Sequence, residues 1–188
     1  IQDFIRAKDP GSASRYLSRF ARLIRNILDC SLEEMIPVSR EIETIDIFLI
    51  IQNLRLVVIF DFEILVDKSL NREVIMLPAM LVQPFVENAI DHGIRFKSEK
   101  GNIIISFALN GLWLDIRVED NGVGRKKAFE LESNNRKDYT SVSTNLIRER
   151  LRILNKKTRQ KISLEVIDLY NHEGIAAGTR VEIRIPVK

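Results

Sequence analysis

The pattern of apolar and polar positions changes its period once, near residue 55. Before that point apolar residues recur at spacings of three and four, as they do in amphipathic helices. The clearest stripe consists of Ala13, Tyr16, Leu17, Phe20, Leu23, Ile24, Ile27 and Leu28. A turn at Asp9-Pro10-Gly11, with Ser12 as N-cap, should precede this helix. After a connector from Ser31 to Pro37, a further stripe to about Leu54 completes an N-terminal helical region.

Beyond residue 55 the apolar residues mostly alternate, which predicts strands. Strands are expected from about Leu56 to Val66, at Ile103–Leu109, Leu112–Val118, Ile162–Leu169 and Val181–Val187. Asn110-Gly111 is typical of a hairpin turn. Asn71–Pro78 reads as a loop or short strand, and Ile94–Asn102 as a polar connector. With helices at Leu81–Gly93 and after Thr144, the order predicts an α+β fold, a mixed β-sheet with helices stacked on one face.

The segment Leu81–Gly93, LVQPFVENAIDHG, is expected to be one helix that packs against the core. Its apolar stripe leaves Asn88 and Asp91 together on one flank, with His92 nearer the edge. Gly93 is expected to stop the helix. On its own this pattern also fits a buried helix with polar residues at its rim.

Asp120 shares the parity of the apolar face of the strand Leu112–Val118, so its carboxylate should point inward. Burying it without a partner would cost several kcal/mol, so hydrogen-bond donors are expected beside it. Gly122 and Gly124 then allow a tight turn and close approach of a ligand to the backbone. The polar residues 125–143 are expected to form a mobile loop, either a lid or a plain solvated connection.

Composition narrows the class of protein. The 188 residues suit one sizeable domain or a smaller domain with an appendage, and no apolar run reaches the length of about 18 that spans a membrane. The chain begins with Ile and shows no signal peptide, so we expect a piece of a longer protein. One cysteine, Cys30, excludes an internal disulfide, and the presence of only two histidines beside it argues against a Cys/His zinc site.

The first 30 residues account for the whole net charge of +3, because they contain six basic and three acidic side chains. This row of arginines fits a solvated helix face better than a nucleic-acid surface. There is no Walker A motif. Lys127 stands where a dinucleotide-binding fingerprint that begins Gly122-x-Gly124 needs a third glycine.

Three boxes carry a family resemblance: VENAIDHG at 86–93, EDNGVG at 119–124 and AGTRVEIRIP at 177–186. In this order they resemble the GHKL ATP-binding fold of gyrase, heat-shock-90 chaperones, histidine kinases and MutL. LPAMLVQPFVENAIDHG and TNLIRERLRILN further resemble the LytS/YehU-type sensor histidine kinases. The resemblance implies that residues 1–54 are the remainder of a helical dimerisation hairpin and that residues 55–188 are the ATP-binding catalytic domain.

The resemblance also implies a role for individual residues. Asn88 matches the asparagine that coordinates Mg²⁺ on the phosphates, and Asp120 matches the aspartate that accepts a hydrogen bond from the adenine amine. His92 would lie beside the nucleotide, Thr179 would help to close the adenine pocket, and 125–143 would be the ATP lid. The full nucleotide-binding set expected is Asn88, Asp91, His92, Arg95, Asp120, Gly122, Val123, Gly124, Thr144, Asn145 and Thr179, with Mg²⁺ on Asn88.

The chain departs from the family pattern in three ways. The second glycine box reads Ser141-Val142-Ser143-Thr144, without a glycine. Asp91 stands where a basic residue often faces the phosphates, so Arg95, or Arg125 and Lys126 of the lid, would have to compensate. The only histidines are His92 and His172, so the phosphoacceptor histidine is expected upstream of Ile1.

The resemblance implies a sensor histidine kinase that transfers the γ-phosphoryl group of ATP to an upstream histidine and then to a response regulator. It implies a homodimer and the cytoplasmic domain of a bacterial sensor anchored to a membrane through missing N-terminal segments. Two alternatives stay open. A hydrolysing GHKL ATPase would need a glutamate where Pro84 stands, although Glu87 is a candidate catalytic residue. A degenerate nucleotide-binding or scaffold module would have no kinase activity.

Overall fold

A computed structural model describes residues 10–55, 60–133, 149, 151–156 and 161–187. Two long helices open the described chain, α2 (Pro10–Ser31) and α3 (Val38–Arg55). Helix α2 begins two residues before the predicted N-cap, so Ser12 lies inside the helix and that prediction is wrong. Pro10 suits a helix start because its fixed φ angle is helical and its missing N–H would have no partner there.

Five strands form one mixed sheet in the order β2-β4-β5-β7-β6. These strands are β2 (Phe60–Val66), β4 (Gly101–Asn110), β5 (Trp113–Asp120), β6 (Ser163–Tyr170) and β7 (Ala176–Pro186). The β2–β4 pair is parallel and the other neighbours are antiparallel. A separate antiparallel pair joins β1 (Met35–Pro37) to β3 (Met76–Pro78), so the predicted connector before α3 holds a short strand.

The helical segment that follows β3 differs from the single helix predicted for residues 81–93. It consists of α4 (Gln83–Asn88), a π-helical turn η1 (Ala89–Gly93) and a 3₁₀ turn η2 (Ile94–Phe96). Gly93 therefore does not stop the helix, because its backbone is helical and the chain continues to Phe96. The part of residues 125–143 that the structure describes is also not a loop, since Arg125–Ser133 forms helix α5.

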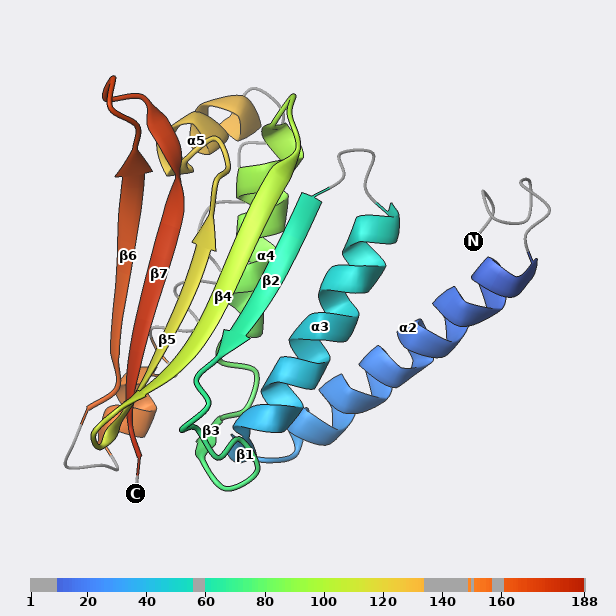
Figure 1. Ribbon diagram of the computed structural model, residues 1–188, viewed down its shortest axis with the longest axis vertical. Helices are drawn as coiled ribbons and strands as arrows, with labels where there is room; N and C mark the ends of the chain where they lie inside the picture. The colour runs from blue at the N-terminus through green and yellow to red at the C-terminus, as the bar shows by residue number, and fades with distance from the viewer. Residues whose placement is uncertain (1–9, 56–59, 134–148, 150, 157–160, 188) are drawn as a thin grey trace.

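One hydrophobic core joins the helices to the sheet, and the α+β prediction is confirmed. Leu114, Ile116 and Val118 of β5 are buried as the alternation predicted. Leu112 was placed on the same face but is 65% exposed, because it lies in the turn that connects β4 to β5. Figure 1 shows α4 along one face of the sheet, with α3 and then α2 beyond the β2 edge. The expected start of a helix at Thr144 lies outside the described residues, whereas residues 151–156 are helical.

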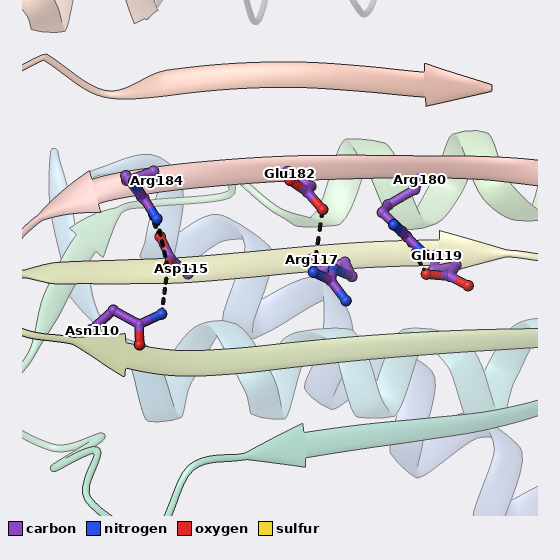
Figure 2. A network of polar contacts seen from close by, with 7 residues as sticks. All are labelled: Asn110, Asp115, Arg117, Glu119, Arg180, Glu182 and Arg184. Carbon is purple, nitrogen blue, oxygen red and sulfur yellow. Dashed lines mark hydrogen bonds and ion pairs between the residues drawn. The ribbon is translucent and has the colours of Figure 1, made fainter. Parts of the chain in front are cut away.

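The opposite face of the sheet carries alternating charges. Arg117 pairs with Glu182, Arg180 with Glu119 and Arg184 with Asp115 between β5 and β7, at N–O distances of 3.2, 2.7 and 2.6 Å (Figure 2). Among the parts of the chain that the structure describes, these side chains cover sheet backbone that no helix covers, so this face contributes little to the core. Among the described residues no helix is long and apolar enough to cross a membrane.

Candidate functional site

Asp120 is the buried carboxylate around which the candidate site is built. It ends β5 and is 5% exposed, so the inward orientation predicted from strand parity is confirmed. Its Oδ1 atom accepts a hydrogen bond from the backbone N–H of Gly122, 2.8 Å away. Burial raises the pKa of Asp120 to about 6, although the backbone N–H groups of Gly122 and Thr179 act in the opposite direction. The group can therefore change its charge near neutral pH.

Three glycines surround Asp120 closely enough to exclude any side chain. A Cβ atom on Gly93 would lie 2.7 Å from Asp120 Oδ1, and one on Gly122 would lie 2.4 Å from the Gly93 Cα. A Cβ atom on Gly178 would lie 1.9 Å from the Asp120 carbonyl oxygen. Glycine at these positions lets three backbone segments meet around one residue, with Gly93 and Gly122 at its carboxylate and Gly178 at its main chain. The sequence pattern does not reveal this role of Gly93, which was expected to end a helix, nor that of Gly178 within AGTRVEIRIP.

Hydrogen bonds hold the turn that follows Asp120. The Asn121 side-chain oxygen accepts from the Asn102 N–H at 2.8 Å, and the Asn121 N–H donates back to the Asn102 carbonyl at 3.2 Å. Lys97 Nζ donates to the Asn121 carbonyl at 2.9 Å. The Val123 N–H donates to the Gly93 carbonyl at 3.3 Å. The turn is thus tied both to β4 and to the η1 turn.

Gly124 links this turn to α5. Its φ angle is +78°, a conformation that favours glycine, and a Cβ atom there would lie 2.9 Å from the Ala176 side chain. The Gly124 carbonyl accepts from the Ala128 N–H at 3.0 Å, so α5 begins immediately after the turn. Val123 is buried beside it at 9% exposure. Gly122, Val123 and Gly124 thus form one tight backbone corner next to Asp120.

Asn88 ends α4, and three other predicted site residues follow it on the η turns. The Asn88 side chain is half-buried and hydrogen-bonds to no side chain or backbone group of the described residues. His92 is half-buried, whereas Asp91 and Arg95 are exposed. The η1 turn packs against β5, β7 and α5, which brings this segment beside the Asp120 strand end. Exposure lets water screen the negative charge of Asp91.

Glu87 and Thr179 take defined places around this arrangement. The Glu87 Oε1 atom accepts a hydrogen bond from Gln83 Nε2 at 2.9 Å, one helical turn earlier. Thr179 of β7 lies opposite Asp120 in the β5–β7 register and is half-buried. Thr144 and Asn145 lie outside the described residues, and their predicted part in the site stays a prediction.

Arg125 does not take the place expected for it. Its guanidinium forms two hydrogen bonds with Asp168 of β6, each 2.7 Å long. This pairing raises the pKa of Arg125 and lowers that of Asp168. The start of α5 is therefore attached to β6. In this structure the Arg125 guanidinium binds the Asp168 carboxylate through its Nε–H and one terminal N–H group. Lys126, the next residue, is exposed.

No group of three or more His, Cys, Asp and Glu side chains gathers among the described residues in a way that could hold a metal ion. The groups that the site does offer are the buried Asp120 carboxylate, an acceptor for a hydrogen-bond donor, and the Asn88 amide. Mg²⁺ commonly keeps several waters and takes only one or two protein ligands beside phosphates. A single amide oxygen on Asn88 fits that manner of binding.

Comparison with known proteins adds the family context. The family model described as histidine kinase matches residues 1–58. Sensor histidine kinase YpdA of Escherichia coli is 32% identical over 120 residues, which cover 62% of this chain and 20% of that protein. Sensor protein LytS of Oceanobacillus iheyensis is 29% identical over 116 residues, covering 62% of this chain and 19% of that protein. The homologues of this chain are sensor histidine kinases. The similarity spans about a fifth of the length of these curated relatives.

Solved histidine kinases share the fold. The histidine kinase domain of the blue-light activated histidine kinase EL346 from Erythrobacter litoralis matches with a TM-score of 0.57 and 16% identity, covering 97% of this chain and 81% of that one. The mycobacterial sensor histidine kinase MprB matches with a TM-score of 0.53 and 12% identity, over 82% and 97% of the two chains. The predicted LytS-like resemblance and the α+β kinase-domain fold are therefore both confirmed.

Proposed function

We propose that this chain is the ATP-binding core of a two-component sensor histidine kinase. In this proposal residues 55–188 bind ATP and Mg²⁺, and residues 1–54 are the remainder of the dimerisation hairpin. The γ-phosphoryl group would pass to a histidine outside residues 1–188, because neither His92 nor His172 lies in the helical region. A response regulator would then receive it.

The buried Asp120 carboxylate is the observation that carries this proposal. It lies against the backbone of Gly93 and Gly122, and a pKa of about 6 leaves it mainly ionised at neutral pH. An adenine amine is a suitable donor, because a desolvated carboxylate gains most from a hydrogen bond that replaces lost water. The absence of side chains at Gly93 and Gly122 lets the backbone of both residues pack directly against the carboxylate, which keeps it out of water.

Asn88 is the proposed Mg²⁺ ligand. Its side chain has no hydrogen-bond partner among the described residues, so an amide oxygen is available without breaking a contact. When bound, Mg²⁺ would neutralise phosphate charge, which is the main requirement of phosphoryl transfer. The protein would supply position: α4 and η1 hold Asn88, and β5 holds Asp120. His92 would lie beside the base, and the residues after α5 would cover it.

The exposed apolar face of α2 supports a homodimer in the intact protein. Leu17, Phe20, Ile24 and Leu28 are 48, 44, 41 and 60% exposed. They follow one another at helical spacing on the side of α2 that α3 does not cover, whereas Leu23 is buried. Arg22 of the basic row pairs with Glu43 of α3 at 2.6 Å. We place the chain on the cytoplasmic side of a membrane-anchored sensor, by analogy with sensor kinases.

Calorimetric titration with ATP, ADP and GTP in the presence of Mg²⁺ tests the proposal. We expect binding of adenine nucleotides and weaker binding of GTP, because guanine presents a carbonyl oxygen where adenine presents its amine. Asp120→Asn should weaken ATP binding about tenfold or more, since hydrogen bonds to charged groups contribute about 1.5–3 kcal/mol.

Asp115→Asn is the matched control, because it makes the same change on the outward face of the same strand. Equal losses in the two variants, or no wild-type binding at millimolar ATP, would contradict the proposal and favour a scaffold module. Steady-state hydrolysis that Glu87→Gln abolishes would instead favour a hydrolysing ATPase. Stable labelling of this chain on histidine by radiolabelled ATP would show that the phosphoacceptor lies within residues 1–188, against the proposal.

A further inference from the structure

Glu41 on α3 is a buried acidic residue that belongs to neither the nucleotide site nor the outer charged face. It is 1% exposed, although a carboxylate is rarely buried without strong compensation. Its Oε1 atom accepts the backbone N–H groups of Val82 at 2.8 Å and of Gln83 at 3.3 Å. Its Oε2 atom accepts the N–H of Met80 at 3.0 Å. The carboxylate therefore binds the stretch of backbone that leads into α4.

These contacts replace the cap that α4 lacks locally. The N-cap residue is Val82, which has no side-chain acceptor and makes no side-chain cap hydrogen bond. Pro84 has no N–H, and Phe85 and Val86 already donate to the Val82 carbonyl. The first backbone donors of a helix normally need such partners. A residue about 40 positions earlier in the sequence supplies them here.

The backbone that Glu41 holds is also strained. Met80 has a φ angle of +53°, and no other described residue apart from glycine has a positive φ. Such a conformation costs roughly 1–3 kcal/mol and persists only when the surroundings impose it. The Met80 N–H bound to Glu41 is one contact that imposes it.

A side-chain hydrogen bond of Gln83 connects the start of α4 to the proposed nucleotide site. Gln83, whose N–H binds Glu41, donates from its side chain to Glu87 at 2.9 Å, and Glu87 precedes Asn88. The Gln83 side chain is buried, and its Oε1 has no hydrogen-bond partner in the described structure. Gln83 is thus fixed by its two bonds, one to α3 and one along α4.

We propose that Glu41 is a positioning residue that fixes α4, and through it Glu87 and Asn88, relative to α3 of the helical hairpin. Helix α3 packs against α2 on one side and against β2 and α4 on another (Figure 1). A shift or rotation of α3 therefore moves the acceptor for three backbone donors at the start of α4. Its consequence for nucleotide binding rests on the function proposed above, whereas its structural part does not.

Hydrogen exchange in Glu41→Gln tests the structural part. The variant keeps one acceptor oxygen but replaces the second with an amide NH₂ group, which cannot accept from a backbone N–H. We expect amide exchange at Met80, Val82 and Gln83 to rise at least tenfold, while exchange in β5 and β7 rises much less. Glu43→Gln, two residues along the same helix but facing α2, is the matched control and should leave all of these amides unchanged.

Nucleotide titration of the same variants tests the positioning role. Glu41→Gln should weaken Mg²⁺-ATP binding about tenfold and weaken adenosine binding, which does not involve Asn88, by less than threefold. Glu41→Asp should restore part of the affinity, because a shorter carboxylate still accepts from backbone donors. A variant that merely destabilised the fold would instead speed exchange equally throughout the sheet.

The outcomes separate the two proposals. Unchanged exchange at residues 80–83 in Glu41→Gln would show that Glu41 does not fix the backbone at the start of α4. Increased exchange there with undiminished Mg²⁺-ATP affinity would overturn the positioning role. Failure of the wild-type chain to bind ATP would refute the proposed function, while the exchange experiment would still decide whether Glu41 fixes α4.

Discussion

Gly93 on the η1 turn and Asp120 at the end of β5 are in direct contact, and a Cβ atom on Gly93 would lie 2.7 Å from Asp120 Oδ1. The φ angle of Gly93 is −94°, which any residue can adopt, so glycine is needed here for space and not for backbone conformation. A side chain at position 93 would therefore overlap the Asp120 carboxylate.

Gly93→Ala should therefore displace the Asp120 carboxylate and weaken ATP binding at least tenfold in calorimetric titration. Gly111→Ala is the control, because Gly111 has a φ angle of +63° and nothing lies within 4 Å of a Cβ atom there. That control should lose about 1 kcal/mol of stability through backbone strain and keep its nucleotide affinity. Loss of binding in both variants would mean that destabilisation, not the Asp120 contact, is responsible.

Asp120 should make the stability of the chain depend on pH in the opposite direction from a salt-bridged aspartate. Its pKa is about 6 in the folded state, whereas an unfolded aspartate titrates near 3.9. Between about pH 4 and pH 6 the folded state therefore holds more protons, so this residue lowers the free energy of unfolding as pH rises through that window, by roughly 3 kcal/mol in total.

Urea denaturation of wild type and Asp120→Asn at several pH values measures this effect. The variant should lack this component of the pH dependence and, at pH 8, should have a free energy of unfolding at least as high as wild type. It should at the same time bind ATP poorly. The Asp120 carboxylate would then lower the free energy of unfolding and raise the affinity for ATP. A variant much less stable than wild type at pH 8 would show that the carboxylate is compensated in the fold.

Asn88→Ala should affect binding without affecting stability. The side chain is half-buried and makes no hydrogen bond to another described residue, so its removal should change the free energy of unfolding by less than about 1 kcal/mol. We expect the affinity for Mg²⁺-ATP to fall, while the affinity for adenosine, which carries no phosphate, stays within twofold. Comparable losses for the two ligands in competition titrations would argue against a role of Asn88 at the metal.

Asp115→Asn should have little effect on stability, although the ion pair that it breaks is well formed. Asp115 accepts from Arg184 at 2.6 and 3.0 Å on the open face of the sheet, and this contact lowers its pKa (Figure 2). The Arg184 side chain is 54% exposed, and such surface pairs contribute about 0–1 kcal/mol. Thermal unfolding at low and high salt should show a small difference that salt reduces further.

The alternation of the strands allowed the central features of the fold to be predicted. The parity of Leu114, Ile116 and Val118 placed Asp120 inside, and Asn110-Gly111 predicted the turn between β4 and β5. These features follow from local pattern, because side chains alternate along a strand. Leu112 was misplaced because an apolar residue in a two-residue turn continues the same alternation in sequence.

Contacts between distant segments could not be predicted in this way. Gly93 reads as a helix stop, since only the structure reveals that the Asp120 side chain at the end of β5 reaches it. Glu41 reads as an ordinary acidic residue in the first turn of a helix, and its acceptance of the Met80 and Val82 donors has no local signal. Arg125 reads as a free cation of a lid, whereas Asp168 on a strand 43 residues later binds it.

The capping of α4 by Glu41, together with the pairing of β1 with β3, has a practical consequence for dividing this chain into fragments. A fragment that starts at residue 55 would include the whole sheet and every predicted nucleotide-binding residue. It would nevertheless leave three backbone donors near Met80 without their acceptor and β3 without its partner strand. The smallest fragment that we expect to keep the Glu41 hydrogen bonds and the β1–β3 pair begins before Met35, well inside the helical region.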